Sequence, residues 1–139
     1  MTGWRKIARV AAGTAGVLTL AAAQIPAALR TTSPGLWEIT GAPGLKGPVR
    51  QCVADPVALA QFEHRGKRCS RSVITDGPSS TVIHYNCPGG EFGESKLTVI
   101  TPRSLRIETQ GISQGLPFNY VIQARRVGDC PGVATAAAH

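Results

Sequence analysis

Hydrophobic and polar residues alternate along most of the chain beyond residue 34, and a period of two is typical of β-strands with one buried face. The run from Leu36 to Thr40 shows the pattern, because Trp37 and Ile39 fall on one face of an extended chain. Strands are expected at residues 36–40, 49–53, 69–75, 80–87, 94–101, 105–109 and 118–124. Proline and glycine predict loops or turns at 41–48, 76–78, 88–90 and 111–117.

One segment departs from this alternation and predicts a short helix. Asp55 can accept hydrogen bonds from the free N–H groups of a first turn, and Pro56 suits the first helical position. The apolar run 57–62 follows, and Gly66 ends the helix. The residues expected to face the core are Val57, Ala60 and Phe62.

The expected fold is mainly β, in the α+β class. We expect a curved antiparallel sheet or partial barrel of six to seven strands, with one short helix inserted after the second strand. The single domain covers residues 34–130 and follows a leader at residues 24–33. Residues 131–139 are small and featureless, and we expect a disordered tail there.

Residues 1–23 have the pattern of a cleavable export signal. A basic stretch precedes an uncharged apolar run from Val10 to Ala23, and small residues stand just before Gln24. As a helix this run would reach about 21 Å, which is short of a hydrocarbon core of about 30 Å. We therefore expect an exported, periplasmic protein that begins near Gln24, with no transmembrane anchor in the mature chain.

Removal of this signal also changes the charge balance. The whole chain has 15 basic and 8 acidic side chains, and the signal carries the cations Arg5, Lys6 and Arg9. The mature chain would keep 12 basic against 8 acidic side chains, a net charge of +4. This modest excess is ordinary for a protein near anionic lipid or glycan, and it gives little support to nucleic-acid binding.

Four cysteines lie in the predicted domain, and an even number in an exported chain predicts two disulfides. A zinc site is the rival interpretation, because His64 and His84 each stand within five residues of a cysteine, but no close cysteine pair is present. Four cysteines allow three pairings. We favour the pairing in which one bond closes the segment that contains the helix and the other ties the end of the domain to a central strand. The pairs are Cys52–Cys69 and Cys87–Cys130.

Several short motifs in the domain resemble those of a known bacterial family. They are P-G-L-W-E-I-T at 34–40, Gln51-Cys52 before the helix, C-P-G-G at 87–90 and R-R-V-G-D-C at 125–130. In this order they resemble the envelope family called domain of unknown function 3617, over residues 34–130. The chain lacks the methionine-rich stretches of many members, since it has only Met1. The resemblance implies a periplasmic, mostly β domain and no particular activity.

Two motifs raise the question of catalysis. Gly111-Ile112-Ser113-Gln114-Gly115 matches G-x-S-x-G, and Asp129 and His139 follow in the order of a hydrolase triad. That motif needs a helix after the serine, whereas Pro117 and an alternating run follow here. Glu91 and Glu94 flank a glycine-rich turn and could form a carboxylate pair, although exposed loop carboxylates are more common. His84 has the pattern of a half-exposed strand residue.

The densest basic cluster follows the helix, and it could contact anionic lipid, glycan or an acidic partner. Its cations are Arg65, Lys67, Arg68 and Arg71. The apolar face of the sheet is the second feature of interest, because one short helix should leave part of it open to a ligand. Its members are Trp37, Ile39, Leu105, Ile107, Phe118, Tyr120 and Ile122.

These observations favour a periplasmic, non-enzymatic binding module for an apolar or envelope-derived molecule. One alternative is a structural or stress-related envelope protein that acts through protein–protein contacts. A hydrolase that uses Ser113 is a weaker alternative. No cofactor, metal or nucleic-acid partner is expected.

Overall fold

The fold is described from a computed structural model. The structure describes residues 25–132 together with Gly13, Gly16 and Val17. The remaining residues of the expected export signal, Gln24 and residues 133–139 of the expected tail lie outside the described residues. No described helix is long and apolar enough to cross a membrane.

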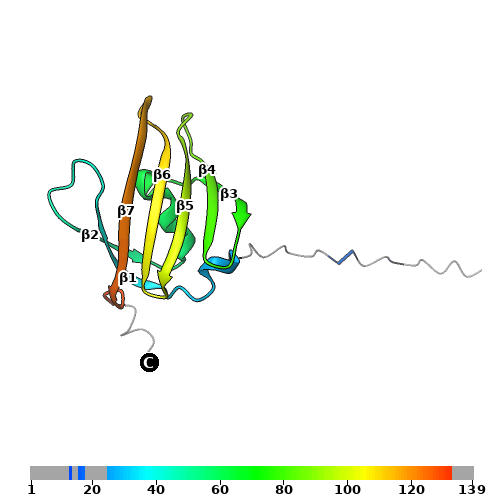
Figure 1. Cartoon of the computed structure of the whole chain (residues 1–139). Helices are drawn as coiled ribbons and strands as arrows, with labels where there is room; N and C mark the ends of the chain where they lie inside the picture. Colours follow the sequence, from blue (N-terminus) through cyan, green and yellow to red (C-terminus); the bar gives the residue numbers. More distant parts are fainter. Residues whose placement is uncertain (1–12, 14–15, 18–24, 133–139) are drawn as a thin grey trace, which may run out of the picture.

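Seven antiparallel strands form one open sheet, which confirms the mainly β fold (Figure 1). The spatial order is β2-β1-β7-β6-β5-β4-β3, so β2 and β3 are its two edges. The elements are η1 (Ala27–Leu29), β1 (Gly35–Thr40), β2 (Val49–Val53), η2 (Pro56–His64), β3 (Ser70–Asp76), β4 (Ser80–Asn86), β5 (Phe92–Thr101), β6 (Ser104–Ser113) and β7 (Leu116–Gly128).

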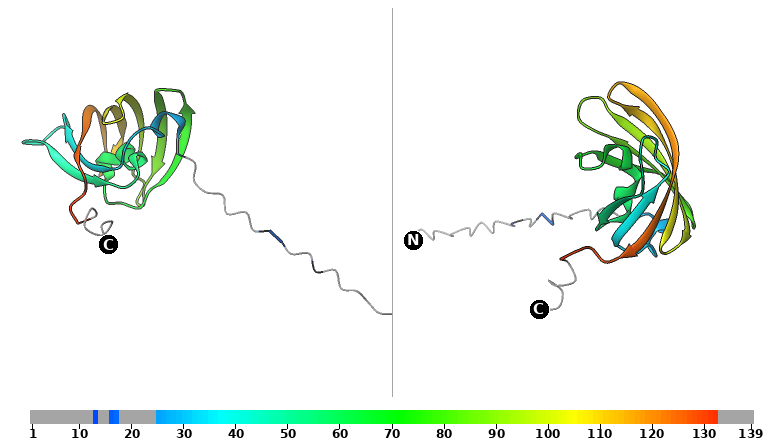
Figure 2. Two further views of the ribbon diagram at one scale, coloured as in Figure 1. Left: turned by 90° about the horizontal axis from the view of Figure 1, so that it is seen from below. Right: turned by 90° about the vertical axis from the view of Figure 1, so that its left-hand side faces the viewer.

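The sheet curves around η2, as the right-hand view of Figure 2 shows. We call the face toward η2 the inner face and the opposite one the outer face. The inner face carries the core, in which Leu59 and Phe62 of η2 pack on strand residues. The fully buried strand residues include Trp37, Ile39, Ile83, Leu97, Leu105, Ile107 and Ile122.

The inner face has more cover than the sequence predicts. In the expected leader, η1 places Leu29 in the core at 1% exposure, and Ala42 and Leu45 of the 41–48 loop pack against the core from the other side. Five of the seven apolar positions named for this face are fully buried, while Phe118 and Tyr120 are partly buried. The expectation that one short helix leaves this face open is therefore not met at those five positions.

The predicted helix is present, but it is a 3-10 helix rather than an α-helix. Asp55 caps it, because its side chain accepts a hydrogen bond from the Val57 N–H at 3.0 Å. A 3-10 helix has three residues per turn, so residues three apart face the same side. Pro56 and Leu59 follow this spacing and are buried. The backbone departs from helical geometry at Gln61 (φ −103°, ψ 36°), and Gln61 is buried too. Ala60 and Phe62 face the core as expected, whereas Val57 is only half-buried.

The prediction of a loop at residues 111–117 is wrong. β6 continues to Ser113 and β7 starts at Leu116, so the turn contains just Gln114 and Gly115. Both have positive φ, +51° and +76°, as a tight hairpin turn requires. Gly111 lies within β6, where a Cβ would come 2.1 Å from the Phe92 carbonyl oxygen. The glycine therefore permits a close approach of two strands and does not mark a loop.

All four cysteines form disulfides, but the favoured pairing, Cys52–Cys69 and Cys87–Cys130, is wrong. The bonds are Cys69–Cys87 and Cys52–Cys130. Ser70 pairs with Asn86 in the β3–β4 ladder, so Cys69 and Cys87 are the next residues outward on the two strands. Leu36 of β1 pairs with Cys52 on one side and with Gly128 on the other, and this brings Cys130 to the same end of β1.

Candidate functional site

The basic residues singled out in the sequence line one cleft at the end of η2. The cleft has a volume of about 430 Å³ and lies among η2, the loop that follows it, β2 and the start of β3. No acidic side chain lines it in the described part of the chain. Its lining residues are Gln51, Ala58, Gln61, Arg65, Gly66, Lys67, Arg68, Cys69 and Arg71.

The loop that carries these cations is held in place from beneath. The Gln61 side-chain amide is 6% exposed, and its N–H group donates to the carbonyl oxygens of His64 (3.2 Å) and Lys67 (2.9 Å). The Cys69–Cys87 disulfide anchors the end of the loop to the β3–β4 hairpin. The backbone of the loop that carries the cations is therefore held in place before any ligand binds, which reduces the entropy cost of binding.

Each cation of the cleft has a different local environment. The Arg65 guanidinium donates to the Phe62 carbonyl at 3.1 Å and lies 4.5 Å from the centre of the Phe62 ring. The Lys67 ammonium pairs with Glu91 from the β4–β5 turn. Arg68 and Arg71 have no acidic side chain within 4 Å among the described residues. Among the described residues only Lys67 pairs with an acidic side chain, so the charges of the three arginines are available to an external anion.

Glu91 connects the cleft to the tip of the β6–β7 hairpin. Its hydrogen bond from Lys67, and then the one from the Gln114 backbone N–H at 3.0 Å, hold the pKa of the Glu91 carboxyl below its usual range. At neutral pH this carboxylate is therefore ionised and offsets the charge of Lys67.

A buried histidine lies behind Glu91. His64 is 2% exposed, and its Nδ1 lies 3.0 Å from the Tyr85 hydroxyl. Its Nε2 lies 3.6 Å from Glu91 Oε2 and has no hydrogen-bond partner among the described residues. The Phe118 ring packs edge-on against the imidazole, with centroids 5.8 Å apart. This histidine has a charged neighbour on one nitrogen and a hydroxyl on the other.

Glu91, His64 and Tyr85 have the order of a catalytic triad, but the hydroxyl does not suit a nucleophile. Tyr85 is fully buried, and burial, followed by the nearby charge of Glu63, raises its pKa far above the usual tyrosine range. An activated nucleophile needs a lowered pKa and access to a substrate. The neighbouring Tyr120 behaves alike, because burial and its 2.6 Å hydrogen bond to Glu63 raise its pKa.

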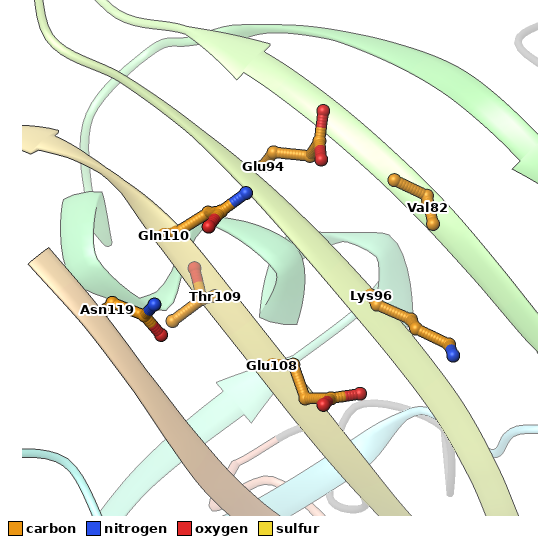
Figure 3. A pocket seen from close by; sticks show the side chains of 7 residues that line it. All are labelled: Val82, Glu94, Lys96, Glu108, Thr109, Gln110 and Asn119. Atoms are coloured by element: carbon orange, nitrogen blue, oxygen red, sulfur yellow. The ribbon is translucent and has the colours of Figure 1, made fainter.

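The outer face of the sheet carries a second hollow, of about 380 Å³ (Figure 3). Cross-strand pairing places His84, Glu94, Gln110 and Asn119 side by side in one row. Lys96 and Glu108 flank the row, so acidic, basic and neutral groups alternate there. Such a mixed surface does not select a ligand of one charge and is typical of a solvated sheet face.

The structure does not bring the other sequence candidates together. Glu91 contacts His64 on the inner side, whereas Glu94 lines the outer hollow, so the two carboxylates do not face a common substrate position. Ser113 ends β6 at one tip of the β6–β7 hairpin, while Asp129 lies beyond the other end of β7 and pairs with Arg126. His139 lies outside the described residues.

The sequence reveals the basic cluster but not the residues behind it. His64, Tyr85 and Glu91 come from η2, β4 and the following turn, and no local motif links them. No local signal identifies His64, because the backbone departs from helical geometry at Gln61 and no single helical period turns His64 toward the sheet.

Comparison with known proteins gives one match. The family model described as "Protein of unknown function (DUF3617)" matches residues 32–130. No curated protein and no solved structure matches the chain.

Proposed function

The chain belongs to the DUF3617 family of proteins of unknown function, and we propose that it is a non-enzymatic binding module for an anionic ligand. The ligand presents a phosphate, sulfate or carboxylate group to the basic cleft formed by Arg65, Lys67, Arg68 and Arg71. The observation that carries this proposal is the convergence of four cations on one preformed cleft without an acidic lining residue.

Electrostatics supports an anion as the occupant. The three arginines of the cleft have like charges that repel one another, whereas Glu91 offsets the charge of Lys67. An anion in the cleft replaces the repulsion among the arginines by attraction. Arginine presents a planar fork of N–H donors that matches carboxylate, sulfate and phosphate oxygens. Arg68 and Arg71 have these donors free of acidic partners.

An anionic ligand is a better candidate than the apolar one expected from the sequence. Burial of Trp37, Ile39 and Ile107 by η1, η2 and the 41–48 loop leaves those positions closed to a ligand. The basic cleft is open to solvent, because Arg65, Lys67, Arg68 and Arg71 are all exposed.

Export to the periplasm is part of this proposal. Its supports are the signal-like residues 1–23 and the two disulfides, which persist in oxidising compartments. In that compartment anionic groups occur both on lipid headgroups and on free small molecules. Both sources offer the same chemistry to the cleft.

Calorimetric titration with sodium sulfate at low ionic strength tests the proposal. We expect saturable binding that the Arg68→Gln/Arg71→Gln double variant weakens by about tenfold, since each lost charge removes a solvent-screened interaction with a dianion. Lys46→Gln is the matched control, because Lys46 is exposed and does not line the cleft. Equal losses in both variants, or no saturable binding, would overturn the proposal.

A second arm separates the two sources of the anion. Retention on phosphatidylcholine vesicles that contain phosphatidylglycerol, lost in the double variant and absent on phosphatidylcholine alone, would identify a headgroup. Sulfate binding without retention on either vesicle would identify a free anion.

A further inference from the structure

We propose that His64 makes the basic cleft bind anions more tightly as the pH falls, by taking Glu91 from Lys67. This inference rests on the proposed function, since it concerns the regulation of the same cleft. It starts from one anomaly, a buried imidazole nitrogen without a hydrogen-bond partner that faces a carboxylate.

Three groups share one negative charge at this point. Glu91 Oε2 accepts from Lys67 and lies 3.6 Å from His64 Nε2. With His64 neutral, Lys67 is the cation nearest to Glu91, and the pair has no net charge. Lys67 is then held toward Glu91 and contributes little to an anion in the cleft.

A proton taken from solvent by His64 changes this balance. The imidazolium donates from both nitrogens, so it can serve the Tyr85 oxygen at Nδ1 and Glu91 at Nε2 together. Burial strengthens the second interaction, because water screens it little. Two cations then compete for one carboxylate, and Lys67, whose side chain is 48% exposed, is free to turn to the cleft.

The titratable and charged groups that face His64 come from several elements packed around it. It faces Tyr85 of β4, Glu91 of the β4–β5 turn and, through Glu91, Lys67. On the β7 side it meets Phe118 and then Tyr120, which is bonded to Glu63. Among these types of side chain, imidazole is the one whose ordinary pKa lies between pH 5 and pH 8, which is why we consider the histidine as the switch.

Sulfate titrations of the full mature chain at pH 7.5 and pH 5.5 test this coupling, because sulfate keeps its double charge at both. For the natural chain we expect affinity to rise by about three- to tenfold at pH 5.5, the effect of one screened unit charge beside a dianion. His64→Asn keeps a polar atom near Tyr85 but cannot titrate, and its affinity should be equal at both pH values.

Glu91→Gln gives an independent readout that does not require a change at the buried histidine. It releases Lys67 at any pH, so its affinity at pH 7.5 should equal that of the natural chain at pH 5.5. His84→Asn is the matched control on the outer face and should keep the full pH response. Circular dichroism at both pH values confirms that each variant is folded.

The outcomes separate this inference from the proposed function. Sulfate binding that depends on Arg68 and Arg71 but is equal at both pH values in the natural chain would overturn the role of His64 alone. A pH response that persists in His64→Asn or disappears in His84→Asn would do the same. No sulfate binding at either pH would overturn both proposals.

Discussion

The two disulfides differ in what they hold, and this difference can be measured. Cys69–Cys87 closes the open end of the β3–β4 hairpin, and the two cysteines are 18 positions apart in the sequence. Cys52–Cys130 connects the strands on either side of β1 and spans 78 residues. The perturbation is to replace each pair by serine, in two separate double variants.

The length of the loop that each disulfide closes sets the expected loss of unfolding free energy when that disulfide is removed. A cross-link restricts the unfolded chain more when the loop is longer, and the loop-entropy relation gives about 3 kcal/mol for 18 residues and about 4.5 kcal/mol for 78. Packing favours neither pair strongly, because Cys87 and Cys130 are each 8% exposed, Cys69 is half-buried and Cys52 is exposed. Removal of Cys52–Cys130 should therefore cost about 1.3 kcal/mol more than removal of Cys69–Cys87.

Urea unfolding without reductant, followed by tryptophan fluorescence, measures both costs, since Trp37 is fully buried. A larger loss for the Cys69–Cys87 variant would refute the reasoning. Mass spectrometry of an unreduced digest gives the pairing directly, and peptides joined as Cys52–Cys69 would contradict the structure. The same spectrum identifies the first residue of the protein from its natural source, and a chain that retains Met1 would contradict a cleaved export signal.

Two further predictions concern the tyrosines of the inner face. Gly93→Ala should destabilise the fold by about 1–3 kcal/mol, because a Cβ at Gly93 would lie 2.4 Å from the Tyr85 ring; Gly47→Ala, where nothing lies within 4 Å, should cost less than about 0.5 kcal/mol in the same urea assay. An equal loss of stability in the two glycine variants would contradict the predicted clash with the Tyr85 ring. Tyr85 and Tyr120 are the only tyrosines of the chain, and both have a pKa raised by burial, so the folded protein should show little tyrosinate absorbance at about pH 11, where the urea-unfolded chain is ionised. Because a raised pKa stabilises the folded state below the unfolded pKa of about 10, stability should fall as the pH rises above that value. If half of the tyrosinate absorbance of the folded protein appeared near pH 10, the buried environment of the two tyrosines would be contradicted.

The charge network also explains why the candidate site lies at one end of the sheet. The end of η2, the β4–β5 turn and the β6–β7 turn meet there, and each supplies a polar group to Glu91 or His64. Strand termini and turns tolerate such groups because their backbone is not committed to the ladder. The middle of the inner face, by contrast, is filled by apolar side chains such as Ile107 and Ile122.

Local chemistry was readable from the sequence because it acts over a few residues. Alternation placed all seven strands, Asp55 and Pro56 marked the start of the helix, and the cations from Arg65 to Arg71 are close in the cleft because they are close in the chain. Even the Cys69–Cys87 bond was implicit, since extension of the predicted hairpin from its turn at 76–78 makes these residues neighbours.

The tertiary structure alone decided the features that depend on distant segments. Pairing of β7 with β1 brought Cys130 to Cys52, and η1 closed a face that the sequence left open. His64, Tyr85 and Glu91 meet because strand register and the path of the kinked η2 direct them to one point. Periodicity reports which face a residue takes, whereas contacts across the sheet depend on how strands are ordered and aligned, and that order is set by the packing of the whole chain.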